Sequence, residues 1–259
     1  MAYAYKSARC DVPRWCPLMT HGFVQNLARP GGNATGFTIM EPTTTGKWLE
    51  LLKEIAPRSN RAALLFNPAT APYASIYLNP FKAAAASLGL EPIAATVHDR
   101  AELDTVIAAQ AREPNGGLIV IPDGFLNVHR ADIISLAARH RLPAIYPWRF
   151  FAEEGGLLSY GSEQRDFFRL AASYVDRIFK GEKPADLPAQ APTEYKLVIN
   201  LKTANALGLA VPSALLDRGD QGDRVADRFC FNVRYWYLAH DRVCTAHAAL
   251  TQSGHWRRG

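Results

Sequence analysis

Several residues that could bind a ligand follow short apolar segments of the sequence. Asn67 comes directly after the segment RAALLF, and Asp123 comes directly after GGLIVIP. Tyr146 and Tyr160 each end a further apolar segment. If these segments are strands of one parallel sheet, their carboxyl ends share an edge, and ligands of open α/β sheets bind at that edge. An amide, a carboxylate and two phenol rings suit a zwitterionic or aromatic small molecule.

Each of these side chains has an expected role. Asp123 is suited to an ammonium group, and Asn67 is suited to a carboxylate or a carbonyl. With two neighbouring positions added, the expected substrate-binding residues are Asn67, Asp123, Phe125, Tyr146, Tyr160 and Gly161. The alternative is that Asn67 and Asp123 are turn residues beside proline, and that the two tyrosines only pack in the core.

The sequence lacks the motifs that identify common catalytic sites. The segment GGLLSYG has its glycines at the wrong positions for the G-x-S-x-G elbow of hydrolases. Gly46-Lys47 resembles the end of a phosphate-binding loop, but Glu41 and Trp48 stand where that motif needs Gly and Ser or Thr. GGNATG does not have the spacing of a dinucleotide-binding loop. Histidines and carboxylates form no triad or pair, so we expect no enzyme, no catalytic residue and no cofactor.

The excess charge and the cysteines lie outside the middle of the chain. Residues 31–216 carry equal numbers of basic and acidic residues, so the net charge of +5 belongs to the two flanks. A neutral body gives no electrostatic footprint for nucleic acid, and we expect none to bind. The flanks also hold all the cysteines, which are Cys10, Cys16, Cys230 and Cys244. Their spacing fits no zinc motif, and the cluster of His240, Cys244 and His247 is weak evidence, so no metal site is expected.

The elements that must position the strand-end residues alternate regularly along the chain. Helical spacing of apolar residues predicts helices over 46–57, 73–88, 100–112, 131–141, 167–179 and 201–207. Short apolar runs predict strands over 62–66, 92–97, 118–121, 144–146, 157–160 and 196–199. Alternating strands and helices predict an α/β fold with a doubly wound, mostly parallel sheet. The first 22 residues have no clear period, and basic and acidic residues interrupt every apolar run that a signal peptide would need.

Four long segments of the sequence resemble a known family. They are LARPGGNATGFT (27–38), KWLELLKEIAP (47–57), AARHRLPAIYPWRFFAEEGGLLSYG (137–161) and the segment from YVDRIFKGEKP to VPSALL (174–216). Over residues 23–216 the chain is similar to the substrate-binding proteins of ABC transporters, of the type described as tryptophan/tyrosine transport binding proteins. The resemblance implies a type I periplasmic-binding-protein fold, in which two Rossmann-like lobes close over a ligand by bending at a hinge.

The resemblance also implies a division of the chain. Residues 1–22 are expected to be a divergent segment, 23–38 a remnant of the first lobe, and 39–147 a complete α/β lobe. Residues 148–216 would supply a crossover, a helix of the first lobe and closing elements, followed by a divergent tail over 217–259. The expected hinge residues are Thr38, Pro147 and Gly155, because the chain is expected to pass between lobes near these positions.

The function that the resemblance implies is ligand binding for an ABC importer. The expected partners are a small molecule, such as an aromatic or other amino acid, and the permease subunits in the membrane, with the chain itself a monomer. The resemblance implies a periplasmic or extracellular location, although no signal peptide is readable and a cytoplasmic location fits the chain as it stands. Two alternatives are a truncated, non-functional remnant of such a protein, and an α/β enzyme or nucleotide binder.

Overall fold

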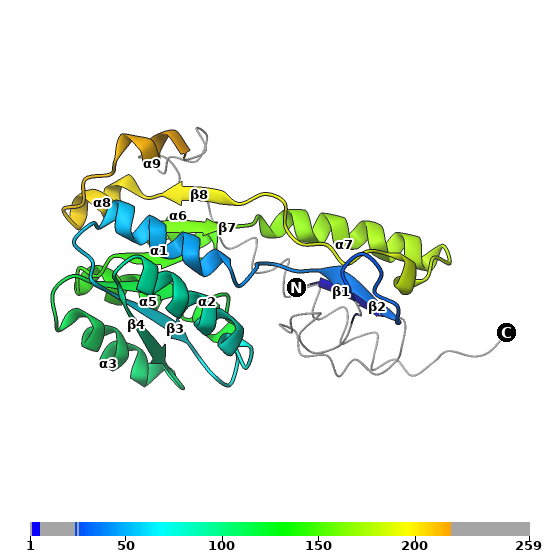
Figure 1. The fold of residues 1–259 in the computed structure, drawn as a ribbon, viewed down its shortest axis with the longest axis horizontal. Coiled ribbons are helices and arrows are strands. Elements are labelled where there is room, and N and C mark those ends of the chain that lie inside the picture. The colour runs from blue at the N-terminus through cyan, green and yellow to red at the C-terminus, as the bar shows by residue number, and fades with distance from the viewer. Residues whose placement is uncertain (1, 6–23, 25, 219–259) are drawn as a thin grey trace. The chain divides into compact units, whose positions relative to one another are not determined.

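A computed structural model describes residues 2–5, 24 and 26–218 (Figure 1). The apolar runs of the sequence form the strands of one six-stranded sheet. In spatial order these are β4 (Glu91–Thr96), β3 (Arg61–Phe66), β5 (Gly116–Val120), β6 (Ala144–Tyr146), β7 (Leu158–Gly161) and β8 (Lys196–Ile199). The first five strands are parallel to their neighbours, and only β8 is antiparallel to β7. The expected α/β fold with a mostly parallel sheet is confirmed.

Helices connect these strands, as the spacing of apolar residues predicts. They are α1 (Thr44–Ile55), α2 (Ala74–Ser87), α3 (Arg100–Ala111), α4 (Gly124–Val128), α5 (Arg130–Arg139) and α6 (Arg149–Glu153). Helix α1 packs against α2, and α3 packs against α5. After β8 come α8 (Leu201–Ala206) and α9 (Ser213–Arg218). None of the described helices is long and apolar enough to cross a membrane.

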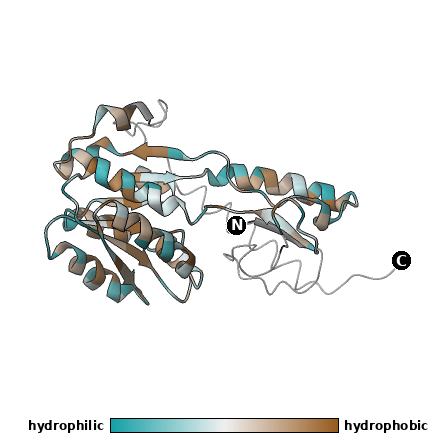
Figure 2. Cartoon of the chain, in the orientation of Figure 1, coloured by the Kyte–Doolittle hydropathy of each residue, from teal (hydrophilic) through white to brown (hydrophobic). Residues whose placement is uncertain are grey.

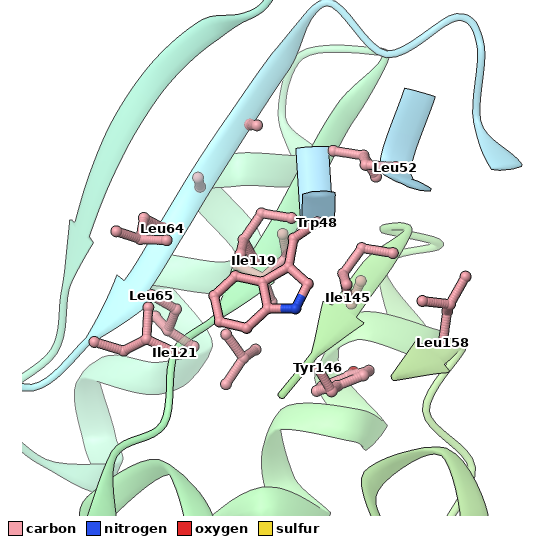
Figure 3. Close-up of a cluster of buried hydrophobic side chains, with 14 of the residues drawn as sticks. Trp48, Leu52, Leu64, Leu65, Ile119, Ile121, Ile145, Tyr146 and Leu158 are labelled. Carbon is pink, nitrogen blue, oxygen red and sulfur yellow. The ribbon is translucent and has the colours of Figure 1, made fainter. Parts of the chain in front are cut away.

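The main core is formed by the sheet together with buried side chains of several helices, among them α1, α2, α3 and α5. Trp48 of α1 is fully buried, and its indole ring lies among aliphatic side chains such as Leu65, Ile119 and Ile145 (Figure 3). The indole Nε1–H donates a hydrogen bond to the carbonyl oxygen of Tyr160 in β7, at 2.8 Å. One side chain therefore links the first helix of the lobe to its fifth parallel strand.

The sheet continues beyond Pro147, where the complete lobe is expected to end. Strands β7 and β8 extend it on the β6 side, so residues on both sides of that boundary share one core. The segment expected as a crossing near residues 146–156 is instead a connection between two neighbouring strands, β6 and β7. Ile145 of β6 pairs with Leu158 of β7, so the connection between these two strands begins and ends in the same sheet.

A second group of elements forms what we call the α7 region. It consists of β1 (Ala2–Tyr5), which pairs antiparallel with β2 (Ala34–Phe37), together with α7 (Gln164–Phe179) and the short helix η1 (Pro184–Asp186). Its core is a small cluster of four buried side chains, which are Phe37, Phe167, Tyr174 and Leu187. No element was expected in residues 1–22, so β1 is a strand that the sequence pattern does not reveal.

Candidate functional site

The carboxyl edge of the parallel sheet contains a point where the chain reverses its direction across the sheet. From β3 the chain passes to β4 on one side, and from β4 it passes back across β3 to β5. Such a switch point is where open α/β sheets bind ligands, because the connections leave a crevice between the two strands. Asn67 follows β3 and Asp123 follows β5, so the structure brings both predicted residues to this point.

Asp123 connects three segments at the switch point. Its Oδ2 accepts a hydrogen bond from the Asn67 backbone N–H at 2.8 Å. Its Oδ1 accepts from the Thr70 hydroxyl at 2.5 Å and from the Phe125 N–H at 2.8 Å, which caps α4. Burial raises the pKa of this carboxyl, and the hydrogen bonds from Thr70 and the backbone oppose that shift. Both oxygens are thus used by the chain itself, which matches the turn-residue alternative for Asp123.

Asn67 is engaged in the same way. Its side-chain amide donates to the His98 carbonyl at 3.0 Å, and its Oδ1 accepts from the Ala69 N–H at 2.8 Å. The side chain is 2% exposed. Asn67 therefore holds the turn after β3 together, and a direct contact with ligand stays a prediction.

Tyr146 lies within the core. Its ring is 1% exposed and stacks on Phe151, with 4.8 Å between the ring centroids. Figure 3 shows it beside the buried side chains under Trp48. Burial raises the pKa of its hydroxyl well above the ordinary value.

Phe125 and Tyr160 differ from these three residues because each keeps part of its surface exposed. The Phe125 ring packs 4.5 Å from the ring of His129, and the Tyr160 ring stacks on Tyr195 at 5.5 Å with 18° between the planes. Desolvation raises the pKa of the Tyr160 hydroxyl. Among the predicted site residues, Phe125 and Tyr160 are therefore the two whose aromatic rings are accessible to a ligand.

Gly161 is placed at a close approach of two backbones. A Cβ atom at this position would lie 1.9 Å from the Pro147 carbonyl oxygen, so only glycine lets β7 end beside the segment after β6. Gly161 has no side chain to contact a ligand, so its contribution is to let the backbones of two segments approach closely at the carboxyl edge of the sheet.

The structure also brings in residues that sequence reasoning missed. Trp148 follows β6 and is 1% exposed, yet its indole Nε1–H has no hydrogen-bond partner among the described residues. The Oδ1 of Asn127 in α4 likewise accepts no hydrogen bond from any residue that the structure describes, and Val128 beside it is 66% exposed. Tyr195 precedes β8, whose place beside β7 cannot be read from chain order. Trp148 stands two residues after the end of β6, whereas Asn67 follows β3 directly, so its position in the sequence was a weaker signal.

In the described part of the chain, three passages join the sheet to the α7 region, at residues 38–41, 162–163 and 190–195. They are hydrogen-bonded to one another near the expected hinge residue Thr38. The Thr38 N–H donates to the Gln190 carbonyl at 2.8 Å, and the Ser162 hydroxyl donates to the Ile39 carbonyl at 2.5 Å. The Thr38 hydroxyl oxygen is buried without a partner among the described residues. Thr38 thus lies on a passage between the two groups of elements.

The other two expected hinge residues lie elsewhere. Pro147 and Gly155 are both in the connection between β6 and β7, within the six-stranded sheet. Gly155 has a φ of 113°, which favours glycine, and its carbonyl accepts a hydrogen bond from the Thr203 hydroxyl at 2.9 Å. These contacts fix the turn before β7.

Metal ligation finds no support in the described part of the chain, which contains no group of three His, Cys, Asp or Glu side chains that could hold an ion. The cluster of His240, Cys244 and His247 lies outside the described residues.

A parallel sheet with a switch point, joined by several chain passages to a further group of elements, defines a periplasmic-binding-protein-like fold. The profile of the family "ABC transporter substrate binding protein" matches residues 1–222. The chain belongs to this family, as the sequence motifs predict. The family consists of solute-binding proteins rather than enzymes.

Individual relatives agree with this assignment. A tyrosine-binding protein of Clostridioides difficile (strain R20291) is 22% identical over 218 residues, which is 82% of this chain and 62% of that protein. The chain therefore spans less than two thirds of the length of this relative.

Solved structures show the same fold. A conserved domain protein of Vibrio cholerae has a TM-score of 0.71 and 27% identity, over 78% of this chain and 67% of that one. The ABC domain in complex with L-Trp from Streptococcus pneumonia has a TM-score of 0.71 and 25% identity, over 78% and 69%. A ligand-free, open substrate-binding protein of Clostridium difficile with adhesive properties has a TM-score of 0.58 and 21% identity, over 76% and 65%.

Proposed function

We propose that this chain binds an aromatic amino acid at the carboxyl edge of its sheet, as the solute-binding component of an ABC importer. The observation that carries the proposal is the switch point between β3 and β5, with the partly exposed ring of Phe125 just after β5 and that of Tyr160 two strands further along the sheet, in β7. Relatives described as binding L-Trp and tyrosine support the choice of ligand class.

The residues at this edge of the sheet have different roles in the proposed binding. Phe125 and Tyr160 provide apolar faces on which an aromatic ring can stack. The Trp148 indole N–H has no partner in the described part of the chain, and a carboxylate or carbonyl of the ligand can accept from it; a buried donor left unpaired costs about 1–3 kcal/mol. Asp123 and Asn67 act indirectly, by holding the turns after β5 and β3 in place.

Binding is proposed to occur in a cleft that closes by bending at the three chain passages beside Thr38, with no chemical change to the ligand. The closed form would then dock on permease subunits in the membrane. Proteins of this family are normally extracellular or periplasmic, and we propose the same location for this chain. Fractionation of cells that express the full chain tests the location.

The binding test is titration calorimetry of the full chain with L-tryptophan and L-tyrosine, with L-glutamate as the non-aromatic comparison. Ligand at about 100 times its dissociation constant adds about 2.7 kcal/mol to the stability of the folded state, so thermal shift provides a second measurement. We expect the two aromatic amino acids to bind and L-glutamate not to bind. A folded sample that binds neither aromatic amino acid contradicts the proposal and favours a non-functional remnant.

Substitutions locate the site. Phe125→Ala and Tyr160→Ala remove a ring and are each expected to weaken binding by about tenfold, equivalent to about 1.4 kcal/mol. Phe179→Ala is the matched control, because it removes an equally large ring from the exposed face of α7. Equal affinities for Phe125→Ala and Phe179→Ala would move the site away from the switch point.

A further inference from the structure

Helix α7 carries two apolar stripes, and other described residues cover only one of them. The inner stripe, Phe167, Ala171, Tyr174 and Ile178, packs in the cluster with Phe37 and Leu187. The outer stripe is offset by one residue and consists of Phe168, Ala172, Val175 and Phe179. Its large members are exposed, at 55% for Phe168, 39% for Val175 and 86% for Phe179. Figure 2 shows apolar and polar residues alternating along this helix.

This exposure is concentrated in one place. Among the described residues, the large apolar side chains that are classed as exposed are Val128 and four residues of α7, which are Phe168, Leu170, Val175 and Phe179. Exposed apolar residues scattered singly are ordinary, but a contiguous stripe on one helix marks an interaction site.

The spacing of the outer stripe identifies the kind of surface that it fits. Successive members are four, three and four residues apart, which is the a/d spacing of a coiled-coil seam. A seam of this kind buries its side chains against another helix with the same spacing, and a second copy of α7 supplies one.

Charge selects the direction of this pairing. In an antiparallel pair centred between Ala172 and Val175, Phe168 meets Phe179 of the second copy, and Ala172 meets Val175. On one side of the seam, Arg169 of each copy then lies opposite Asp176 of the other copy. The two-fold axis gives two such pairs of opposite charge. A parallel pair offers no matched charges at these positions.

The other flank is also compatible with self-pairing. There the half-buried Ala171 of the inner stripe lies opposite the half-buried Ile178 of the second copy, so the exposed parts of two apolar residues extend the seam. Within one chain, Arg169 pairs with Asp166 at 3.2 Å and Asp176 pairs with Lys180 at 2.7 Å. Both are exposed pairs of low energy, so the two charged side chains can exchange these partners for each other.

We propose that two copies of this chain associate through the outer stripe of α7, in an antiparallel and two-fold symmetric helix pair. This departs from the monomer expected from the sequence, and it does not depend on the proposed ligand. The mass of the chain is 28.6 kDa. The test is sedimentation equilibrium of the full chain, which should give a concentration-dependent rise from this mass to twice this mass.

The sharpest variants exchange the flanking charges. Arg169→Asp alone and Asp176→Arg alone each place like charges across the seam, and each is expected to weaken association about tenfold or more. The double variant Arg169→Asp/Asp176→Arg restores opposite charges and should recover association close to that of the natural chain. A double variant that associates no more tightly than the single variants overturns the antiparallel pairing.

Two substitutions test the stripe itself. Phe179→Asp is expected to give a monomer, because it places a carboxylate opposite Phe168 of the second copy. Leu170→Asp is the matched control, because Leu170 is a 40% exposed apolar residue of the same helix that points away from the seam. Circular dichroism checks that each variant remains folded. A natural chain that is monomeric at high micromolar concentration, or that forms mixed aggregates equally sensitive to both substitutions, overturns the proposal.

Discussion

The six-stranded sheet and the α7 region bury their apolar side chains to very different extents. In the sheet, strands such as β5 are buried along their whole length, and α1 contributes seven buried residues. In the α7 region, a helix of 16 residues buries only Phe167 and Tyr174. The sheet is built mainly from consecutive strand and helix units, whereas the α7 region is assembled from segments far apart in the sequence. A lobe built from consecutive units can complete its own core, whereas the described part of the α7 region leaves one apolar stripe of its helix exposed.

The largest expected effect is on the core of the sheet. Trp48→Ala removes a fully buried indole and its hydrogen bond to Tyr160, and should lower the free energy of unfolding by about 3–5 kcal/mol. Urea denaturation followed by circular dichroism measures this loss. If β7 belongs to the same cooperative unit as α1, the variant will unfold in one transition, and separate transitions for the two would contradict that unity.

A smaller effect is expected where the sheet passes into the α7 region. Gly161→Ala introduces a Cβ atom 1.9 Å from the Pro147 carbonyl, and the required backbone shift should cost about 1–3 kcal/mol. Gly32→Ala is the control, because no atom lies within 4 Å of its added Cβ, and its effect should stay within about 0.5 kcal/mol. Equal denaturation midpoints for the two variants would show that the close approach is not rigid.

The smallest effect distinguishes the two regions directly. Tyr174→Phe removes a hydroxyl that donates to the Pro188 carbonyl and accepts from the Gln190 amide, and Tyr73→Phe removes one that donates to the Pro122 carbonyl. Each loss should cost about 0.5–1.5 kcal/mol. We expect Tyr174→Phe to speed hydrogen exchange in α7 while β5 is unchanged, and Tyr73→Phe to lower the protection of β5. Faster exchange in β5 after Tyr174→Phe would mean that the two regions unfold together.

Local features of the fold could be predicted well from the sequence. The strands at 144–146 and 196–199 are predicted with the bounds that the structure gives, because short apolar runs with clear ends report burial on both faces. The place of β7 and β8 in the sheet could not be predicted, because periodicity carries no information about which strands pair. Strand β1 has no pattern that separates it from its surroundings.

The location of the candidate site could be predicted from the sequence, but the contacts of its side chains could not. The rule that ligands bind at strand carboxyl ends correctly predicts that Asn67 and Asp123 lie at the switch point. It does not predict that the side chains of both residues already form hydrogen bonds within the chain. Tyr146 is the last residue of its strand, and only the register of the sheet decides that its ring enters the core. Trp148 and Tyr195 could not be predicted as site residues, because the residues around them belong to strands that are distant in the sequence.

The hydrogen bond between the Thr35 hydroxyl and the Leu187 carbonyl joins residues 152 positions apart. During synthesis on the ribosome, strands β3 to β6 emerge one after another and can pair as soon as each is made. Strand β2 emerges before all of them, yet the buried side chains that cover Phe37, from Phe167 to Leu187, all follow β7. While β3 to β6 are being made, β2 therefore has β1 as its pairing partner among the described strands, and Phe37 lacks the side chains that later bury it.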